Sequence, residues 1–205
     1  MMNPHVRGHA IESECLHQLT RIGDTLLTGQ QLDTPDNAVK MQIGKASGLR
    51  FLNADILAGE LGMEAYPAAE VATRLRREFV SQGESFIFET VFSDPAGDKL
   101  GFLKRAVQQG YNVVMCFIGI AGAGRSEERV AMRVSQGGHD VPGDKLTARF
   151  PRTMGNLKQA IRELPCVFVF DNDNLQTPFR LAAVFQNGRR KFLAKLVPIW
   201  LDPVL

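Results

Sequence analysis

Short apolar runs alternate with longer amphipathic patterns along most of this chain. Runs rich in β-branched and aromatic residues predict strands at residues 48–55, 85–91, 111–118 and 166–171. Between them, apolar residues spaced by three or four predict helices over 67–82, 95–109 and 146–164. Strands that alternate with helices in this way predict an α/β fold, in which helices flank a mostly parallel sheet.

The two ends of the chain differ from this pattern. Residues 1–47 lack a sustained apolar period, so we expect a divergent N-terminal segment before a domain that spans residues 48–205. Near the C-terminus, apolar runs at 181–185 and 192–197 flank Asn187 and Gly188, a pair typical of tight turns. This arrangement predicts a C-terminal β-hairpin.

Composition narrows the classes of function. The 205 residues include 44% hydrophobic and 22% charged residues, typical of a folded protein, and the formal net charge is +2. So small a charge disfavours a general nucleic-acid binder. The longest apolar run, 111–123, falls short of the roughly 20 residues that span a membrane, and no signal peptide is recognisable. We therefore expect a cytoplasmic protein, with Cys116 and Cys166 as small buried residues and no disulfide framework.

Carboxylates follow three of the predicted strands. Asp55, Glu89 and Asp171 each come directly after an apolar run. Ligands of open α/β sheets bind beyond the carboxyl ends of the strands, so these acids are candidates for chemistry. A structural role is the alternative, and for Asp55 it is capping of the next helix.

Basic residues cluster in the second half of the chain. Arg125, Arg129 and Arg133 recur every four residues and share one face of a helix predicted over 126–136. Arg149 and Arg152 lie beyond the glycine-rich residues that follow this helix. Guanidinium groups match phosphate oxygens, so these arginines are candidates for a phosphate ligand. The alternative is a solvated face paired with neighbouring glutamates.

Other candidate groups point less clearly to chemistry. His139 and Asp140 lie in the glycine-rich loop 137–142, but no nucleophile motif accompanies them, and we interpret them as loop residues. A loose cluster of His5, His9, Cys15 and His17 matches no standard metal motif, so no metal site is predicted. The C-terminal part is basic and favours a solvated hairpin, with Arg180, Arg189, Arg190, Lys191 and Lys195.

Four motifs, taken together, resemble the zeta-toxin-type P-loop kinases, in the single-domain branch described as predicted ABC-type ATPases. The resemblance covers about residues 48–188 and rests on FLNAD (51–55), FIFETVFS (86–93), QGGHDVP (136–142) and FDN (170–172). It implies a three-layer P-loop NTPase-like fold that uses ATP and Mg²⁺. It also implies transfer of the γ-phosphate to a hydroxyl of a small molecule, which in zeta toxins is UDP-N-acetylglucosamine, and an antitoxin as a possible partner.

The resemblance implies a role for individual residues. Asp55 would be the general base for the attacking hydroxyl, and Glu89 would bind the substrate with help from Thr90. Arg133 and Arg149 would neutralise the transferring phosphoryl group.

Further residues would complete the nucleotide lid of such a kinase. Arg129 and Arg152 lie close enough in sequence to exchange roles with the two arginines above. His139 and Asp140 would belong to the same lid.

The chain departs from the family at the phosphate-binding loop. The family places G-x-x-x-x-G-K-S/T about 20 residues before the Asn-Ala-Asp motif, where backbone amides and a lysine hold the nucleotide phosphates. No such loop stands there, and Ile43 to Ser47 is only a partial lookalike. Three interpretations stay open: an inactive remnant of a kinase, a module that binds the former substrate, or an unconventional phosphate site within residues 1–47. A partner-binding protein of a toxin–antitoxin system is the alternative from another class of function.

Overall fold

A computed structural model describes residues 48–122, 143–174 and 176–205. The chain divides into two compact units, of which the first ends at Thr90 and the second begins at Val91. The first unit contains, in order, β1 (Arg50–Leu52), α3 (Ala54–Leu61), α4 (Ala65–Ser81) and β2 (Phe86–Phe88). The second contains α5 (Asp98–Gln108), β3 (Val114–Gly119), α7 (Gly143–Glu163), β4 (Cys166–Asp171), β5 (Arg180–Gln186), β6 (Arg189–Leu193) and η2 (Ile199–Val204). The predicted mixed α/β character is confirmed. The predicted N-terminal segment 1–47, the helix predicted over 126–136 and the glycine-rich loop 137–142 lie outside the described residues.

A two-stranded parallel sheet forms the centre of the first unit. Strands β1 and β2 pair in parallel, with Arg50 opposite Phe86 and Leu52 opposite Phe88. The Phe79 ring of α4 packs against Phe86, with ring centroids 5.2 Å apart. Each strand has only three residues, so β1 and β2 are shorter than the strands predicted over 48–55 and 85–91.

Helix α4 agrees closely with the prediction over 67–82. Ala68 and Ala72 are its buried residues, whereas Ala69 is exposed. The Arg76 guanidinium lies 4.9 Å from the centroid of the Phe88 ring. Burial, together with the charge of Arg77, lowers the pKa of Arg76 below its ordinary value.

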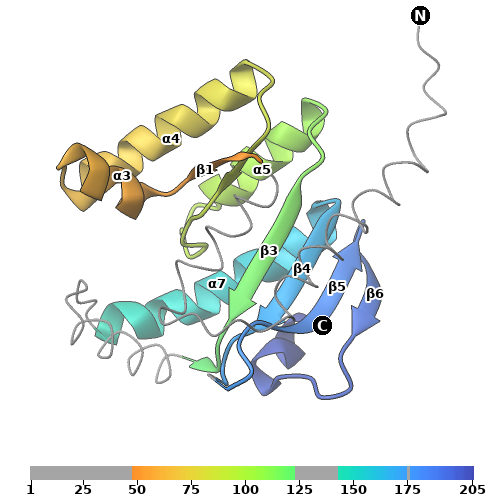
Figure 1. Cartoon of the computed structure of the whole chain (residues 1–205). Helices are drawn as coiled ribbons and strands as arrows, with labels where there is room; N and C mark the ends of the chain where they lie inside the picture. The colour runs from red at the N-terminus through yellow and green to blue at the C-terminus, as the bar shows by residue number, and fades with distance from the viewer. Residues whose placement is uncertain (1–47, 123–142, 175) are drawn as a thin grey trace, which may run out of the picture. The chain divides into compact units, whose positions relative to one another are not determined.

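The four-stranded sheet of the second unit has the order β3-β4-β5-β6 (Figure 1). Strands β3 and β4 are parallel, as predicted, and pair from Val114 opposite Cys166 to Gly119 opposite Asp171. Both remaining pairings are antiparallel, because the C-terminal hairpin continues this sheet. The prediction of a mostly parallel sheet therefore holds for β1 with β2 and for β3 with β4, whereas the four-stranded sheet is mixed.

The predicted hairpin is confirmed, with one change in its second strand. Asn187 and Gly188 have φ values of 49° and 73°, as a tight two-residue turn requires. Pairing resumes directly after this turn, so β6 begins at the basic residue Arg189 and not at Phe192. The basic side chains of β6 are exposed, as expected for a strand at the edge of a sheet.

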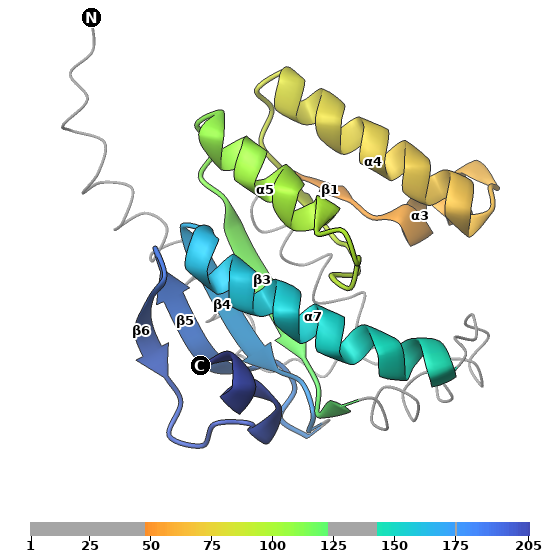
Figure 2. The same cartoon turned by 180° about the vertical axis from the view of Figure 1, so that it is seen from behind.

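Helix α7 contributes its apolar face to the core of the second unit. It lies across one face of the four-stranded sheet, beside α5 (Figure 2). Leu157, Ile161 and Leu164 are buried in one core cluster with Val167 and Val169 of β4, which confirms the predicted apolar face in this part of the helix. Leu157 is 0% exposed.

Two local predictions are wrong. Helix α5 begins at Asp98 and not at Pro95, because Gly97 takes a left-handed conformation (φ 69°) directly before the helix. Cys116 is exposed on β3 and Cys166 is half-buried, so only the latter approaches the predicted burial. Among the helices of the described ranges, none is long and apolar enough to cross a membrane.

Substitution of two glycines of the second unit by alanine should change the stability of the fold in opposite directions. Gly155 is an exposed position of α7 where a Cβ atom meets nothing within 4 Å. Gly155→Ala should stabilise the fold by about 0.5–1 kcal/mol, because glycine disfavours a helix interior.

At Gly119 a Cβ atom would lie 2.2 Å from Cη2 of Trp200. We expect Gly119→Ala to destabilise the fold by about 1–3 kcal/mol in urea unfolding. Equal midpoints for Gly119→Ala and the wild type would contradict this packing.

Candidate functional site

The first unit brings polar residues together where its two strands end. Because β1 and β2 are parallel, their carboxyl ends lie at the same edge of the sheet. Asn53 and Asp55 follow β1, and Glu89 and Thr90 follow β2. The backbone N–H of Glu89 donates to the Leu52 carbonyl at 3.1 Å, which continues the strand pairing by one residue. The sequence-predicted residues Asp55, Glu89 and Thr90 thus start from one edge of one sheet.

Asn53 is the residue that connects these groups. Its buried side chain caps α3, because Oδ1 accepts from the backbone N–H groups of Asp55 (2.7 Å) and Ile56 (3.1 Å). Its Nδ2 donates to Oε2 of Glu89 at 2.6 Å. A single amide therefore fixes the start of α3 and orients the carboxylate of Glu89.

Asp55 is not the cap of α3, which corrects the structural alternative considered for it. Asn53 takes that role, and Asp55 lies in the first turn of the helix with an exposed side chain. Within the described residues, no hydrogen bond or ion pair engages its carboxylate. The carboxylate of Asp55 is therefore open to a ligand at the start of α3.

Glu89 and Thr90 are both half-buried. The bond from Asn53 holds the Glu89 carboxylate in one orientation, which suits it to accept a hydrogen bond from a ligand hydroxyl. An exposed carboxylate and an oriented one thus lie at the same sheet edge, as candidates for a proton acceptor and a binding group.

The described arginine candidates lie in the second unit, on α7. Arg149 is half-buried, and its backbone carbonyl accepts from Oγ1 of Thr153. Arg152 is exposed, and its Nε donates to the Ala148 carbonyl at 2.9 Å. Arg129, Arg133, His139 and Asp140 lie outside the described residues.

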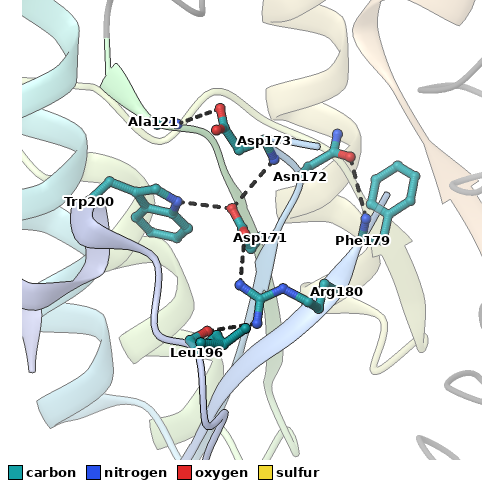
Figure 3. Close-up of polar contacts among 8 residues, drawn as sticks. All are labelled: Ala121, Asp171, Asn172, Asp173, Phe179, Arg180, Leu196 and Trp200. Atoms are coloured by element: carbon teal, nitrogen blue, oxygen red, sulfur yellow. Dashed lines mark hydrogen bonds and ion pairs between the residues drawn. The ribbon is translucent and has the colours of Figure 1, made fainter. Parts of the chain in front are cut away.

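Asp171, the third strand-end acid, has a structural role. Its Oδ1 accepts from the indole Nε1 of Trp200 at 3.0 Å, and its Oδ2 pairs with Nη2 of Arg180 at 3.0 Å (Figure 3). The residue is 9% exposed. Both carboxylate oxygens are engaged, which removes Asp171 from the candidate acids.

A second glycine-rich segment has the spacing of a phosphate loop. Gly119 to Ser126 reads G-I-A-G-A-G-R-S, which differs from G-x-x-x-x-G-K-S/T by Arg125 in place of the lysine. Its first glycine has a packing reason, because the Trp200 ring leaves no room for a side chain there. Residues 123–126 lie outside the described ranges.

Asn53 is the residue that sequence reasoning did not single out. An asparagine directly before a helical pattern is a signal for an N-cap, so its capping role was predictable. Its contact with Glu89 spans 36 positions and leaves no local signal in the sequence.

Neither similarity to known proteins nor a metal-binding cluster indicates what this chain does, so the functional argument rests on the geometry of the site. No protein-family model, curated protein or solved structure matches the chain. In the described ranges, no group of three or more histidine, cysteine, aspartate or glutamate residues is placed to hold a metal ion. The residues His5, His9, Cys15 and His17 lie outside those ranges. The candidate site therefore consists of Asn53, Asp55, Glu89 and Thr90.

The two functions of the Asn53 amide predict a measurable loss of stability. Asn53→Ala removes the cap of α3 and the partner of Glu89, so we expect a loss of about 1–2 kcal/mol in urea unfolding. Glu89→Gln is the matched control, because its amide oxygen still accepts from Asn53, and it should remain within about 0.5 kcal/mol of the wild type. An unchanged unfolding midpoint for Asn53→Ala would show that these bonds contribute nothing.

Proposed function

We propose that this chain is a phosphotransferase of the zeta-toxin type, which transfers the γ-phosphate of ATP to a hydroxyl of a small molecule. The observation that carries the proposal is the bond from Asn53 to Glu89 beside the exposed carboxylate of Asp55. It supports a site that binds a hydroxyl and removes its proton. The P-loop NTPase-like fold is part of the same proposal.

In this reaction the acceptor hydroxyl loses its proton to Asp55 as its oxygen attacks the γ-phosphorus. The bond between the γ-phosphorus and the bridging oxygen breaks, and ADP leaves with that oxygen. Glu89 accepts a hydrogen bond from the substrate, and Thr90 offers a hydroxyl beside it. Proton removal by a positioned carboxylate contributes a factor of about 10² to 10⁴ in rate.

Charge on the transferring group requires cations. Arg149 of α7 is the described candidate, and the sequence adds Arg133, with Arg129 and Arg152 as neighbours that exchange roles with them. His139 and Asp140 belong to the proposed lid through the family resemblance. Mg²⁺ neutralises phosphate charge when it is bound with ATP. It needs only one or two carboxylates besides the phosphates, so the chain does not require a cluster of three ligands.

The acceptor in this proposal is a small molecule with a free hydroxyl, with UDP-sugars as the class that the family resemblance implies. An antitoxin protein as partner comes from the same resemblance, whereas the proposed cytoplasmic location rests on the sequence, in which no signal peptide is recognisable. Nucleic acid is not proposed as a partner, because a net charge of +2 provides no strong attraction for a polyanion.

A second candidate function is a noncatalytic module that binds a nucleotide or sugar nucleotide. The observation in its favour is the absence of G-x-x-x-x-G-K-S/T from the sequence. In that case Glu89 and Asp55 hold a ligand, and no ATP is turned over.

Calorimetry with ATP·Mg²⁺ tests the nucleotide-binding half of the proposed phosphotransferase. For a phosphotransferase we expect micromolar affinity, about −8 kcal/mol. Arg149→Ala should weaken this affinity about ten-fold or more, because a charge-assisted hydrogen bond is lost. Arg162→Ala, an exposed arginine in the last turn of the same helix, is the matched control and should bind like the wild type. Absence of ATP binding, with retained binding of a UDP-sugar, would favour the noncatalytic module.

Asp55→Asn tests the proposed base. In a phosphate-transfer assay with UDP-N-acetylglucosamine, turnover should fall by about 10²-fold or more, because the amide accepts no proton. Asp98→Asn removes an exposed acid from the first turn of another helix, α5, and should keep the wild-type rate. Wild-type turnover in Asp55→Asn, with an unchanged circular dichroism spectrum, would exclude Asp55 as the base.

A further inference from the structure

The single tryptophan of the chain lies at the carboxyl end of strand β3. Trp200 belongs to η2 and is 6% exposed. Its indole N–H donates to Asp171 at 3.0 Å (Figure 3). Its ring occupies the space that a side chain at Gly119 would need. The ring centroid also lies 6.1 Å from that of Phe117. Trp200 therefore contacts both parallel strands of the four-stranded sheet at the same edge.

The residues that follow β4 fix the backbone that follows β3. The N–H of Asn172 donates to the Gly119 carbonyl at 2.8 Å, and the N–H of Ala121 donates to Oδ1 of Asp173 at 3.3 Å. The N–H of Asp173 in turn donates to Oδ1 of Asp171 at 3.4 Å. The carboxylate that binds Trp200 thus organises the turn that holds residues 119–121.

The other side of η2 contacts helix α7. Leu201 and Val204 are buried in the same core cluster as Leu157 of α7. Nζ of Lys158, the next residue of α7, donates to the Pro203 carbonyl at 3.3 Å. The C-terminal segment therefore joins the end of β3 to the helix that carries Arg149 and Arg152.

We propose that Trp200 is a positioning residue: its bond to Asp171 and its packing on Gly119 fix the end of β3 relative to α7. Helix α7 carries Arg149, the described candidate for binding the transferring phosphoryl group. The consequence for catalysis rests on the proposed phosphotransferase function, whereas the positioning itself does not. The competing account is that Trp200 only adds apolar burial to the core.

Asp171 also binds Arg180, so the test needs variants that distinguish the contact with Arg180 from the contact with Trp200. Nη1 of Arg180 donates to the Leu196 carbonyl at 2.7 Å, which ties the segment between β6 and η2 to the same carboxylate. Asp171→Asn keeps an oxygen for the indole N–H and removes the charge that pairs with Arg180. Trp200→Phe keeps a ring and removes the indole donor.

Amide hydrogen exchange on the full chain tests the positioning role. In Trp200→Phe we expect the amides of Ala121 and Asn172 to exchange about ten-fold faster, because a hydrogen bond that holds their turn is lost. Amides of the β5–β6 hairpin should stay within about two-fold of the wild type. Asp171→Asn should keep the slow exchange of Ala121. Ile199→Ala, an exposed neighbour in the same segment, is the matched control and should match the wild type.

Two exchange patterns would overturn the proposal. Unchanged exchange at Ala121 and Asn172 in Trp200→Phe means that the indole does not hold this turn. Equal acceleration throughout the second unit means that Trp200 acts only through general stability.

Kinetics test the catalytic consequence separately. In an active wild type, Trp200→Phe should lower kcat about ten-fold and leave KM for ATP unchanged, as expected when groups that act in the transition state are misplaced. An unchanged kcat, or a rise in KM alone, contradicts this consequence. If the wild type transfers no phosphate, the proposed function fails, and the exchange pattern still supports or overturns the positioning role.

Discussion

The second unit depends on the pairing of one carboxylate that is almost fully buried. An uncompensated charge in a protein interior costs several kcal/mol, so Asp171 requires partners. The indole of Trp200 and the guanidinium of Arg180 provide them, and they come from the C-terminal segment and from β5. Meeting this requirement brings η2 back to the end of β4. It also explains why a glycine stands at position 119, where the ring of Trp200 occupies the space of a side chain.

In the first unit, the polar groups at the strand ends are held by the side-chain amide of Asn53 and not by a buried carboxylate. Asn53 has both donors and an acceptor, so it caps α3 and binds Glu89 at the same time. The carboxylate of Asp55 is left exposed at the start of the helix. The strand-end acid Asp171 is thus used by the fold, whereas Asp55 remains available to a ligand. This difference places the candidate chemistry at the edge of β1 and β2.

The described chain is better provided for an acceptor hydroxyl than for a nucleotide. Phosphoryl transfer needs a base for the hydroxyl, cations for the transferring group and a site for the remaining phosphates. In the proposed reaction, Asp55 and Glu89 would meet the first need and Arg149 would meet the second. For the third, the sequence offers only partial lookalikes, in which an alanine or an arginine interrupts the motif. A test of ATP binding is accordingly the decisive experiment for the proposed phosphotransferase.

The sequence by itself determined the features that arise from local pattern. Apolar spacing predicted α4 and the buried face of α7, and Asn187 with Gly188 predicted the hairpin, because helical periodicity and turn conformation depend on neighbouring residues. The acids at the strand ends were also visible, since strand and acid adjoin in sequence. Only the tertiary structure decided which acid remains available. Asn53 contacts Glu89 across 36 positions, and Trp200 contacts Asp171 across 29. Contacts at such separations are set by the packing of the elements, which no local pattern encodes.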